Sequence, residues 1–213
     1  MTGFSAIDLR VRAENVSVAS LQNRSIGLNP LERLDGFSRW RETAFQPIDV
    51  NDSLKFLNLT DGSYAISMAP IPGAYVGDVR QGDSSIYNTG TITVHGNSAK
   101  NVEVVLRTDG AKVEGVVVGV DGKPATTCKV TLVPQGDRRL NALLYRNMNL
   151  RDGHFSFVDI APGTYKLFAW ENIPFGAEQN AAYMAPYEAR GHIVSLTPGE
   201  STSNITLSLI RAK

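Results

Sequence analysis

The sequence predicts an all-β protein built from two tandem antiparallel β-sandwich domains with little helix. Apolar and polar residues alternate with a period of two along most of the chain, which is the pattern of half-buried strands. The alternating segments are short and end at Gly, Pro, Asn or Asp, and few helix-forming stretches lie between them. One pattern of residues also recurs about 100 positions later, which indicates a duplicated sandwich domain.

The predicted strands follow one another closely and are rich in Val, Ile, Thr and aromatic residues. They cover residues 6–11, 17–21, 63–69, 91–94, 102–106, 112–120, 129–133, 154–160, 164–170, 192–196 and 204–210. Residues 176–190 contain helix formers but are interrupted by Pro186, so we expect a turn or one short helix there.

The recurring pattern defines two copies of one unit. Phe56 and Phe157 are 101 positions apart, and so are Tyr64 and Tyr165. An Asp-Gly turn separates two strand segments near the middle of the chain. We therefore predict a first domain over residues 1–110 and a second over residues 111–213.

The segment FVDIAPGTYKLFAWE, residues 157–171, predicts a β-hairpin. In the Pro-Gly pair at 162–163, Pro fixes φ and Gly accepts positive φ, as a tight turn requires. The alternation places Phe155 and Phe157 on the inward face. Tyr165 follows the turn, where its ring can be buried while its hydroxyl donates to a turn carbonyl, as in the tyrosine corner of sandwiches.

The composition excludes several classes of protein. The 213 residues carry 21 Lys and Arg against 21 Asp and Glu, so we predict no nucleic-acid partner. The single cysteine, Cys128, excludes an internal disulfide, and its strand-like neighbours predict a small buried side chain. No apolar run has the length of a membrane span, and the first residues lack the features of a signal peptide.

Two stretches of the second half carry a family resemblance. VEGVVVGVDGKPATTCKVTLVP and RDGHFSFVDIAPGTYKLFAW resemble the carboxypeptidase regulatory-like domain, a transthyretin-like (prealbumin-like) Greek-key sandwich related to the B-type repeats of bacterial adhesins. The resemblance covers residues 112–169 closely and the first half more loosely from about residue 25. The continuation resembles secreted or envelope proteins of soil bacteria, which implies an extracytoplasmic location, periplasmic or secreted.

Residues able to carry chemistry are scattered along the chain. His95, His154 and His192 share no metal-ligand spacing, and Ser84 lies in a β domain rather than in the α/β setting of an esterase nucleophile. Acidic turn residues could offer oxygens to Ca²⁺, but no calcium-loop motif is present, so we predict no metal and no cofactor. These acidic residues are Asp49, Asp52, Asp61, Asp121, Asp152 and Asp159.

The candidate ligand-binding residues lie where the second hairpin ends and in the long connection after it. Aromatic rings could stack on a sugar or bury part of a protein partner, and carboxylates could accept hydrogen bonds. The alternative is that the tryptophan is buried under the loop and closes the core. The candidates are Trp170, Glu171, Tyr183, Tyr187 and Glu188.

Two functions remain open on these observations. The first is a non-catalytic module for binding, adhesion or spacing, with an unknown protein or carbohydrate as its ligand. The second is a hydrolase of esters or lactones, helped by a metal ion, whose site is not visible as a motif. A pocket that joins His to Ser or Asp at hydrogen-bonding distance would favour the second.

Overall fold

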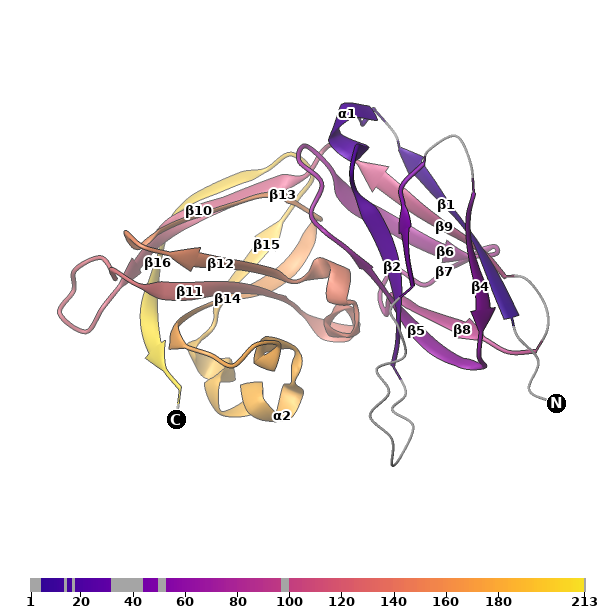
Figure 1. Ribbon diagram of the computed structural model, residues 1–213. Coiled ribbons are helices and arrows are strands. Elements are labelled where there is room, and N and C mark those ends of the chain that lie inside the picture. The colour runs from indigo at the N-terminus through magenta and orange to yellow at the C-terminus, as the bar shows by residue number, and fades with distance from the viewer. Residues whose placement is uncertain are drawn as a thin grey trace. The chain divides into compact units, whose positions relative to one another are not determined.

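The computed structural model describes residues 5–13, 15–16, 18–31, 44–49, 53–96 and 100–212. The chain divides into two compact units (Figure 1). The first comprises Met1–Thr108 with Leu140–Leu143, and the second comprises Asp109–Arg139 with Leu144–Lys213. The boundary set from the sequence, between residues 110 and 111, lies close to this division but assigned residues 140–143 to the second half. Among the described residues, no helix has the length and apolar character needed to cross a membrane.

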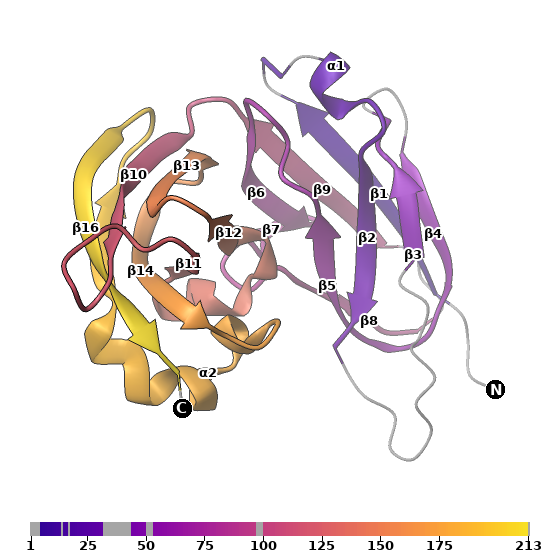
Figure 2. The same ribbon diagram turned by 60° about the vertical axis from the view of Figure 1, so that its left-hand side comes forward.

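The first unit consists of two sheets. The five-stranded sheet has the order β4-β1-β9-β6-β7, and the four-stranded sheet has the order β3-β2-β5-β8 (Figure 2). The strands are β1 (Ser5–Ala13), β2 (Ser25–Pro30), β3 (Ala44–Pro47), β4 (Leu54–Leu59), β5 (Gly62–Met68), β6 (Tyr75–Gln81), β7 (Ser84–Ser85), β8 (Thr91–Val94) and β9 (Lys100–Arg107).

The second unit forms one seven-stranded sheet with the order β12-β11-β14-β16-β10-β13, in which β15 also pairs with β14. β16 pairs with β10 through its first part and with β14 through its last residues. The strands are β10 (Ala111–Val118), β11 (Cys128–Pro134), β12 (Arg146–Leu150), β13 (His154–Ile160), β14 (Gly163–Asn172), β15 (His192–Leu196) and β16 (Ser201–Arg211). β16 therefore joins two groups of strands, β10 with β13 and β11 with β12, β14 and β15, which together give the second unit its sandwich. The all-β sandwich prediction is confirmed.

Two details of the prediction were wrong. Residues 17–21 were expected to form a strand, but those of them that the structure describes form α1 (Val18–Leu21). A short apolar run does not distinguish the two states, and here one helical turn lets the Leu21 side chain reach the core.

The sheets are also not purely antiparallel, because the first and last strands of each unit run parallel. Parallel neighbours need a long connection, and the whole unit lies between these two strands.

Five strand pairs of the first unit have counterparts in the second. In the first, β1 pairs with β4 and β9, β2 with β3 and β5, and β5 with β8. In the second, β10 pairs with β13 and β16, β11 with β12 and β14, and β14 with β15. Each copy even has a register shift at the same place, between β1 and β4 and between β10 and β13. Duplication as the origin of this likeness stays a prediction.

The tyrosine corner is present in both units. The Tyr64 hydroxyl donates to the Thr60 carbonyl at 2.8 Å, and the Tyr165 hydroxyl donates to the Ala161 carbonyl at 2.7 Å. Gly163 has φ of 144°, and a Cβ there would collide with the Arg138 guanidinium. The hairpin and the role predicted for Tyr165 are confirmed.

The burial pattern along β13 and β14 shows that side chains of this hairpin pack into two separate hydrophobic clusters. In β13 burial alternates from His154 to Val158, and Phe155 and Phe157 face inward as predicted. In β14 the alternation stops, because all side chains from Leu167 to Trp170 are buried. Phe168 and Trp170 point to the face opposite Leu167 and pack into a second cluster. A continuous apolar run is typical of a strand that is covered on both faces.

Cys128 lies on β11 and is buried, as its neighbours predicted. Burial raises the pKa of its thiol, because the apolar surroundings disfavour the thiolate. The thiolate is the nucleophilic form, so this residue behaves as a small apolar side chain.

Candidate functional site

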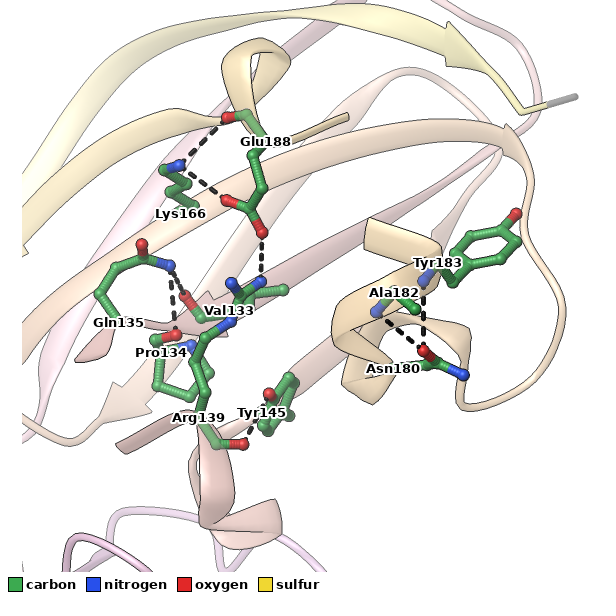
Figure 3. Close-up of polar contacts among 10 residues, drawn as sticks. All are labelled: Val133, Pro134, Gln135, Arg139, Tyr145, Lys166, Asn180, Ala182, Tyr183 and Glu188. Atoms are coloured by element: carbon green, nitrogen blue, oxygen red, sulfur yellow. Dashed lines mark hydrogen bonds and ion pairs between the residues drawn. The ribbon is translucent and has the colours of Figure 1, made fainter. Parts of the chain in front are cut away.

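The long connection of the second unit folds into short helical turns that cover one face of its sheet. The covering segment, residues 173–191, contains η3 (Ala177–Gln179), α2 (Ala181–Met184) and η4 (Ala185–Arg190). The Asn180 side chain caps α2 by accepting hydrogen bonds from the amides of Ala182 and Tyr183 at 3.0 and 3.1 Å (Figure 3). A short helix was predicted here, and Pro186 lies in the first turn of η4, where proline is tolerated.

Trp170 is part of the core and is not exposed to a ligand. Its ring is 0% exposed, stacks on Phe168 at 5.6 Å, and meets the edge of Tyr187 at 5.2 Å. Its Nε1 donates a hydrogen bond to the Thr131 hydroxyl at 3.0 Å, so the polar atom of the indole is also satisfied. The prediction of Trp170 as a ligand-binding residue was wrong, because the covering segment buries the ring.

Tyr183 and Tyr187 continue the aromatic cluster toward the surface. Their rings lie 5.8 Å apart and are half-buried, and both pack against the buried cluster that contains Trp170 and Met184. Their apolar faces are therefore used for internal packing, and they form the outer layer of this core.

The two glutamates among the candidates have different partners. Glu171 is exposed and pairs with Arg211, with 2.8 Å between Oε2 and Nε. Glu188 binds Arg139 at 2.5 Å and Lys166 at 2.7 Å, and Lys166 also donates to the Glu188 carbonyl at 3.1 Å (Figure 3). The five candidates thus divide between the buried cluster, the Glu188 ion cluster and the Glu171 ion pair.

The surroundings of Glu188 shift its acidity. Partial burial by itself would raise the pKa of this carboxyl, but hydrogen bonds and charge from Lys166 and Arg139 outweigh it and hold the pKa below its ordinary value. Arg139 belongs to η1 (Gly136–Leu140), Lys166 to β14 and Glu188 to η4. The ion cluster therefore ties the end of the covering segment to the sheet and to the turn after β11.

Glu178 is a structural residue that the sequence did not reveal. Its side chain is 3% exposed, Oε1 accepts a hydrogen bond from Asn147 Nδ2 at 2.8 Å, and Oε2 lies 3.9 Å from Lys129 Nζ. Lys129 and Asn147 come from β11 and β12, so Glu178 joins the start of the covering segment to two strands. Nothing in GAEQN distinguishes this glutamate from a solvated one.

The exposed aromatic of this region is Phe175, which sequence reasoning also missed. Its side chain is fully exposed, at 102%, and it lies between Pro174 and Gly176 in the turn before η3. Gly176 has φ of 76°, which glycine adopts without strain. The Pro-Phe-Gly triplet could have predicted this exposure, because Pro and Gly favour a turn and turns lie at the surface.

The other candidate residues lie in exposed turns and strand ends. His95, His154, His192 and Ser84 are exposed, and no contact among the described residues joins an imidazole to a serine hydroxyl or a carboxylate. Asp121 and Asp152 stabilise their own turns by accepting from the amide two residues later, as the turn interpretation expected. Asp61 accepts from the amide of Gly96, which is distant in sequence. In the described part of the chain, no three His, Cys, Asp or Glu side chains gather where a metal ion could bind. Asp52 lies outside the described residues.

No protein-family model and no curated protein matches the sequence. Solved structures do show similarity over nearly the whole chain. An ancillary pilin of Streptococcus is 13% identical with a TM-score of 0.34, over 96% of this chain and 62% of that chain. The Bacillus anthracis TIE protein is 12% identical with a TM-score of 0.33, over 98% of this chain and 34% of that chain.

A minor pilin of Streptococcus agalactiae is 11% identical with a TM-score of 0.37, over 96% of this chain and 94% of that chain. At these identities and TM-scores the similarity identifies neither a family nor a function. The resemblance to the carboxypeptidase regulatory-like domain therefore stays a prediction.

Proposed function

We propose that this chain is a non-catalytic β-sandwich module that acts as a load-bearing spacer in an extracytoplasmic protein. The observation that carries the proposal is the parallel pairing of the first and last strands in each unit. The location rests on the family resemblance of residues 112–169. The spacer role rests on how such a pair responds to tension.

In the first unit, β1 and β9 pair over a register that runs from Ile7 with Lys100 to Ala13 with Leu106. The start of β1 and the end of β9 therefore lie at opposite ends of the hydrogen-bond ladder. A force that pulls on these two points shears the ladder, so all of its hydrogen bonds are loaded together. Opening the same ladder from one end would break the bonds one after another at lower force.

The second unit repeats this arrangement. β10 and β16 pair in parallel from Lys112 with Ser201 to Val118 with Ser208. β9 ends at Arg107 and β10 begins at Ala111, so tension that leaves one unit enters the other through residues 108–110. Two shear-loaded units in series are what a spacer under tension requires.

The hydrolase alternative gains no support from the contacts of the described residues. A nucleophile needs a base within hydrogen-bonding reach, and the exposed histidines have no such serine or carboxylate partner among the residues that the structure describes. The candidate aromatic and acidic side chains of the second unit are used for packing and for ion pairs. We therefore propose the spacer alone.

Single-molecule force spectroscopy tests the proposal. A handle at the N-terminus is combined with a second handle at Thr108→Cys, just after β9, or at Asn101→Cys, near its start; both positions are exposed. The first geometry shears the pair, and the second opens it from one end. We expect a clearly higher unfolding force in the first, with a length gain of about 30–35 nm.

Equal unfolding forces in the two geometries would contradict the proposal. Hydrolysis of ester or lactone substrates by the purified chain, lost on substitution of a histidine or of Ser84, would instead restore the hydrolase alternative. Both measurements use the complete chain.

A further inference from the structure

The last strands of the two units have different neighbours. In the first unit, β9 has a strand on each side, because β1 pairs with it in parallel and β6 pairs with it antiparallel. In the second unit, β16 pairs with β10 over residues 201–208 and with β14 only from Leu209 onward. No other described strand pairs with β16, so the edge of residues 201–208 that faces away from β10 is open.

The orientation of the backbone shows which groups face this open edge. A Cβ on Gly115 of β10 would collide with the Ile205 carbonyl oxygen, so this carbonyl points toward β10. Backbone groups of successive strand residues point to opposite edges, so the amides and carbonyls of Thr206 and Ser208 face away from β10. Figure 2 shows β16 at the border of the second unit, with β10 on its inner side. Unpaired backbone groups of this kind are a template for another strand.

The open edge lacks the features that usually keep sheet edges apart. Natural edge strands are short or carry charged side chains or proline. The other border strands of the second unit, β12, β13 and β15, have five to seven residues, and each contains Arg, His or Asp. β16 has 11 residues, and residues 201–210 contain no charged side chain and no proline. The exposed side chains before Leu209 are Ser201, Ser203, Asn204, Thr206 and Ser208.

We propose that the open edge binds a second copy of this chain through antiparallel pairing of the two β16 strands. The first unit supports this direction, because the equivalent edge of β9 is covered by the antiparallel strand β6. A two-fold axis at Leu207 pairs Thr206 of each copy with Ser208 of the other, so the residues that face the edge exchange both backbone hydrogen bonds. This register uses the regular part of β16, since Asn204 has φ of 61° and the register with β10 shifts beside it.

A second copy is the partner that fits, because the edge is complementary to itself. At this register the Thr206 and Ser208 hydroxyls lie opposite each other on the exposed face, and hydroxyl pairs across strands are favourable. Leu207 lies opposite its own counterpart on the core face, and no like charges are brought together. A partner with charged side chains would find no opposite charge on residues 201–208. The pairing leaves the ladder between β10 and β16 intact and is independent of the spacer role.

Sedimentation velocity of the complete chain between about 10 µM and 1 mM tests the proposal. One strand pair buries less surface than a standard interface, so we expect a monomer that forms a dimer with a dissociation constant of about 10 µM to 1 mM. Hydrogen exchange at the same concentrations locates the contact. The Thr206 and Ser208 amides should exchange freely in the monomer, and their exchange should slow by the ratio of total to monomeric chain as the dimer forms.

Charged variants test the register. Thr206→Lys should raise the dissociation constant at least about tenfold, because the two lysines would lie diagonally across the pair on the same face. Ser208→Lys places the same charge on the other residue that faces the edge and should act alike. Ser156→Lys is the matched control, since Ser156 is an exposed residue of β13, the border strand on the far side of β10, and it should leave the dimer unchanged. Circular dichroism of each variant checks the fold.

Three results would overturn the proposal. The first is a chain that stays monomeric at about 1 mM. The second is a dimer whose affinity is equal in Thr206→Lys, Ser208→Lys and Ser156→Lys, because its contact would then lie on another surface. The third is protection of the Thr206 and Ser208 amides in the monomer, because the edge would then be covered within the chain.

Discussion

The two units share five strand pairs but differ in the segment that comes after the tyrosine corner. In the first unit the chain between β5 and β8 forms β6 and β7, and β6 joins the sheet beside β9. In the second unit the chain between β14 and β15 forms the covering segment, which packs on one face of the sheet. The chain after the hairpin therefore adds two strands to a sheet in one copy and forms a second core in the other.

The residues of the hairpin account for this difference. At the offset of 101, Phe168 and Trp170 correspond to Ser67 and Ala69. The aromatic pair lies on the face under the covering segment, where large apolar side chains are stabilised by burial. Serine and alanine would leave little apolar area for such a segment to cover. The tyrosine corner is therefore common to both units, whereas the residues at positions 168 and 170, or 67 and 69, determine whether a further segment packs on the hairpin.

Removing Trp170 should destabilise the second unit and leave the first unit unchanged, because the covered aromatic cluster belongs to the second unit. Trp170→Ala deletes a fully buried ring and leaves the Thr131 hydroxyl without its donor, so we expect the second unit to lose about 4–5 kcal/mol. Hydrogen exchange of the β13 amides measures the stability of this unit, and the β4 amides report the first unit.

Phe175→Ala is the control for this variant, because Phe175 is the fully exposed aromatic of the same segment. It should change stability by less than about 0.5 kcal/mol. Equal losses in the two variants would contradict the assignment of Trp170 to the core.

Phe56 and Phe157 should behave alike, because they occupy equivalent inward positions at 1% and 4% exposure. Phe56→Ala should destabilise the first unit, and Phe157→Ala the second, each by about 3–4 kcal/mol through the lost apolar contacts and the cavity left behind. Urea denaturation with the same exchange probes measures both. A loss below about 1 kcal/mol in either variant would show that the two corners are not equivalent.

The hydroxyl groups of the two corner tyrosines should make similar, small contributions to the stability of their units. Tyr64→Phe and Tyr165→Phe each remove one hydrogen bond to a turn carbonyl, so we expect a loss of about 1 kcal/mol in each unit. Each hydroxyl has a second partner at 3.2 Å, Thr60 Oγ1 for Tyr64 and Arg138 Nη2 for Tyr165. The loss should be larger for Tyr165, because its second partner is charged and hydrogen bonds to charged groups contribute more. Thermal unfolding ranks the two variants, and a larger loss for Tyr64→Phe would reverse this order.

Glu188 should make a pH-dependent contribution to the stability of the second unit and none to that of the first. Its pKa is lower in the folded state than its ordinary value of 4.5, so its contribution is present above that value and disappears as the pH falls through the folded pKa. Since the carboxylate is partly solvated, we expect Glu188→Gln to cost about 0.5–1 kcal/mol at neutral pH.

The difference between wild type and Glu188→Gln should therefore shrink between about pH 5 and pH 3. Urea denaturation at several pH values measures it, with the β4 amides as the internal control. A difference that is constant with pH, or an equal effect on the first unit, would contradict the role of the ion cluster.

The sequence alone determined the β class, the hairpin with its tyrosine corner and the inward face of Phe157. These features depend on neighbours within a few residues: alternation sets the face of a strand, and a glycine that tolerates positive φ sets the turn. The offset between Tyr64 and Tyr165 also indicated, without any structure, that the same corner occurs twice.

The tertiary structure decided the rest, because those features depend on residues that are distant in sequence. Trp170 is buried by residues of a later segment, and Glu178 pairs with Lys129 and Asn147 from two earlier strands. The run LFAW in β14 carried a partial signal, since a strand that is apolar at successive positions is covered on both faces. An aromatic residue on the outer face of a strand can bind a ligand or be buried by another segment. Strand alternation does not show which of the two occurs, because it depends on the segment that packs on that face.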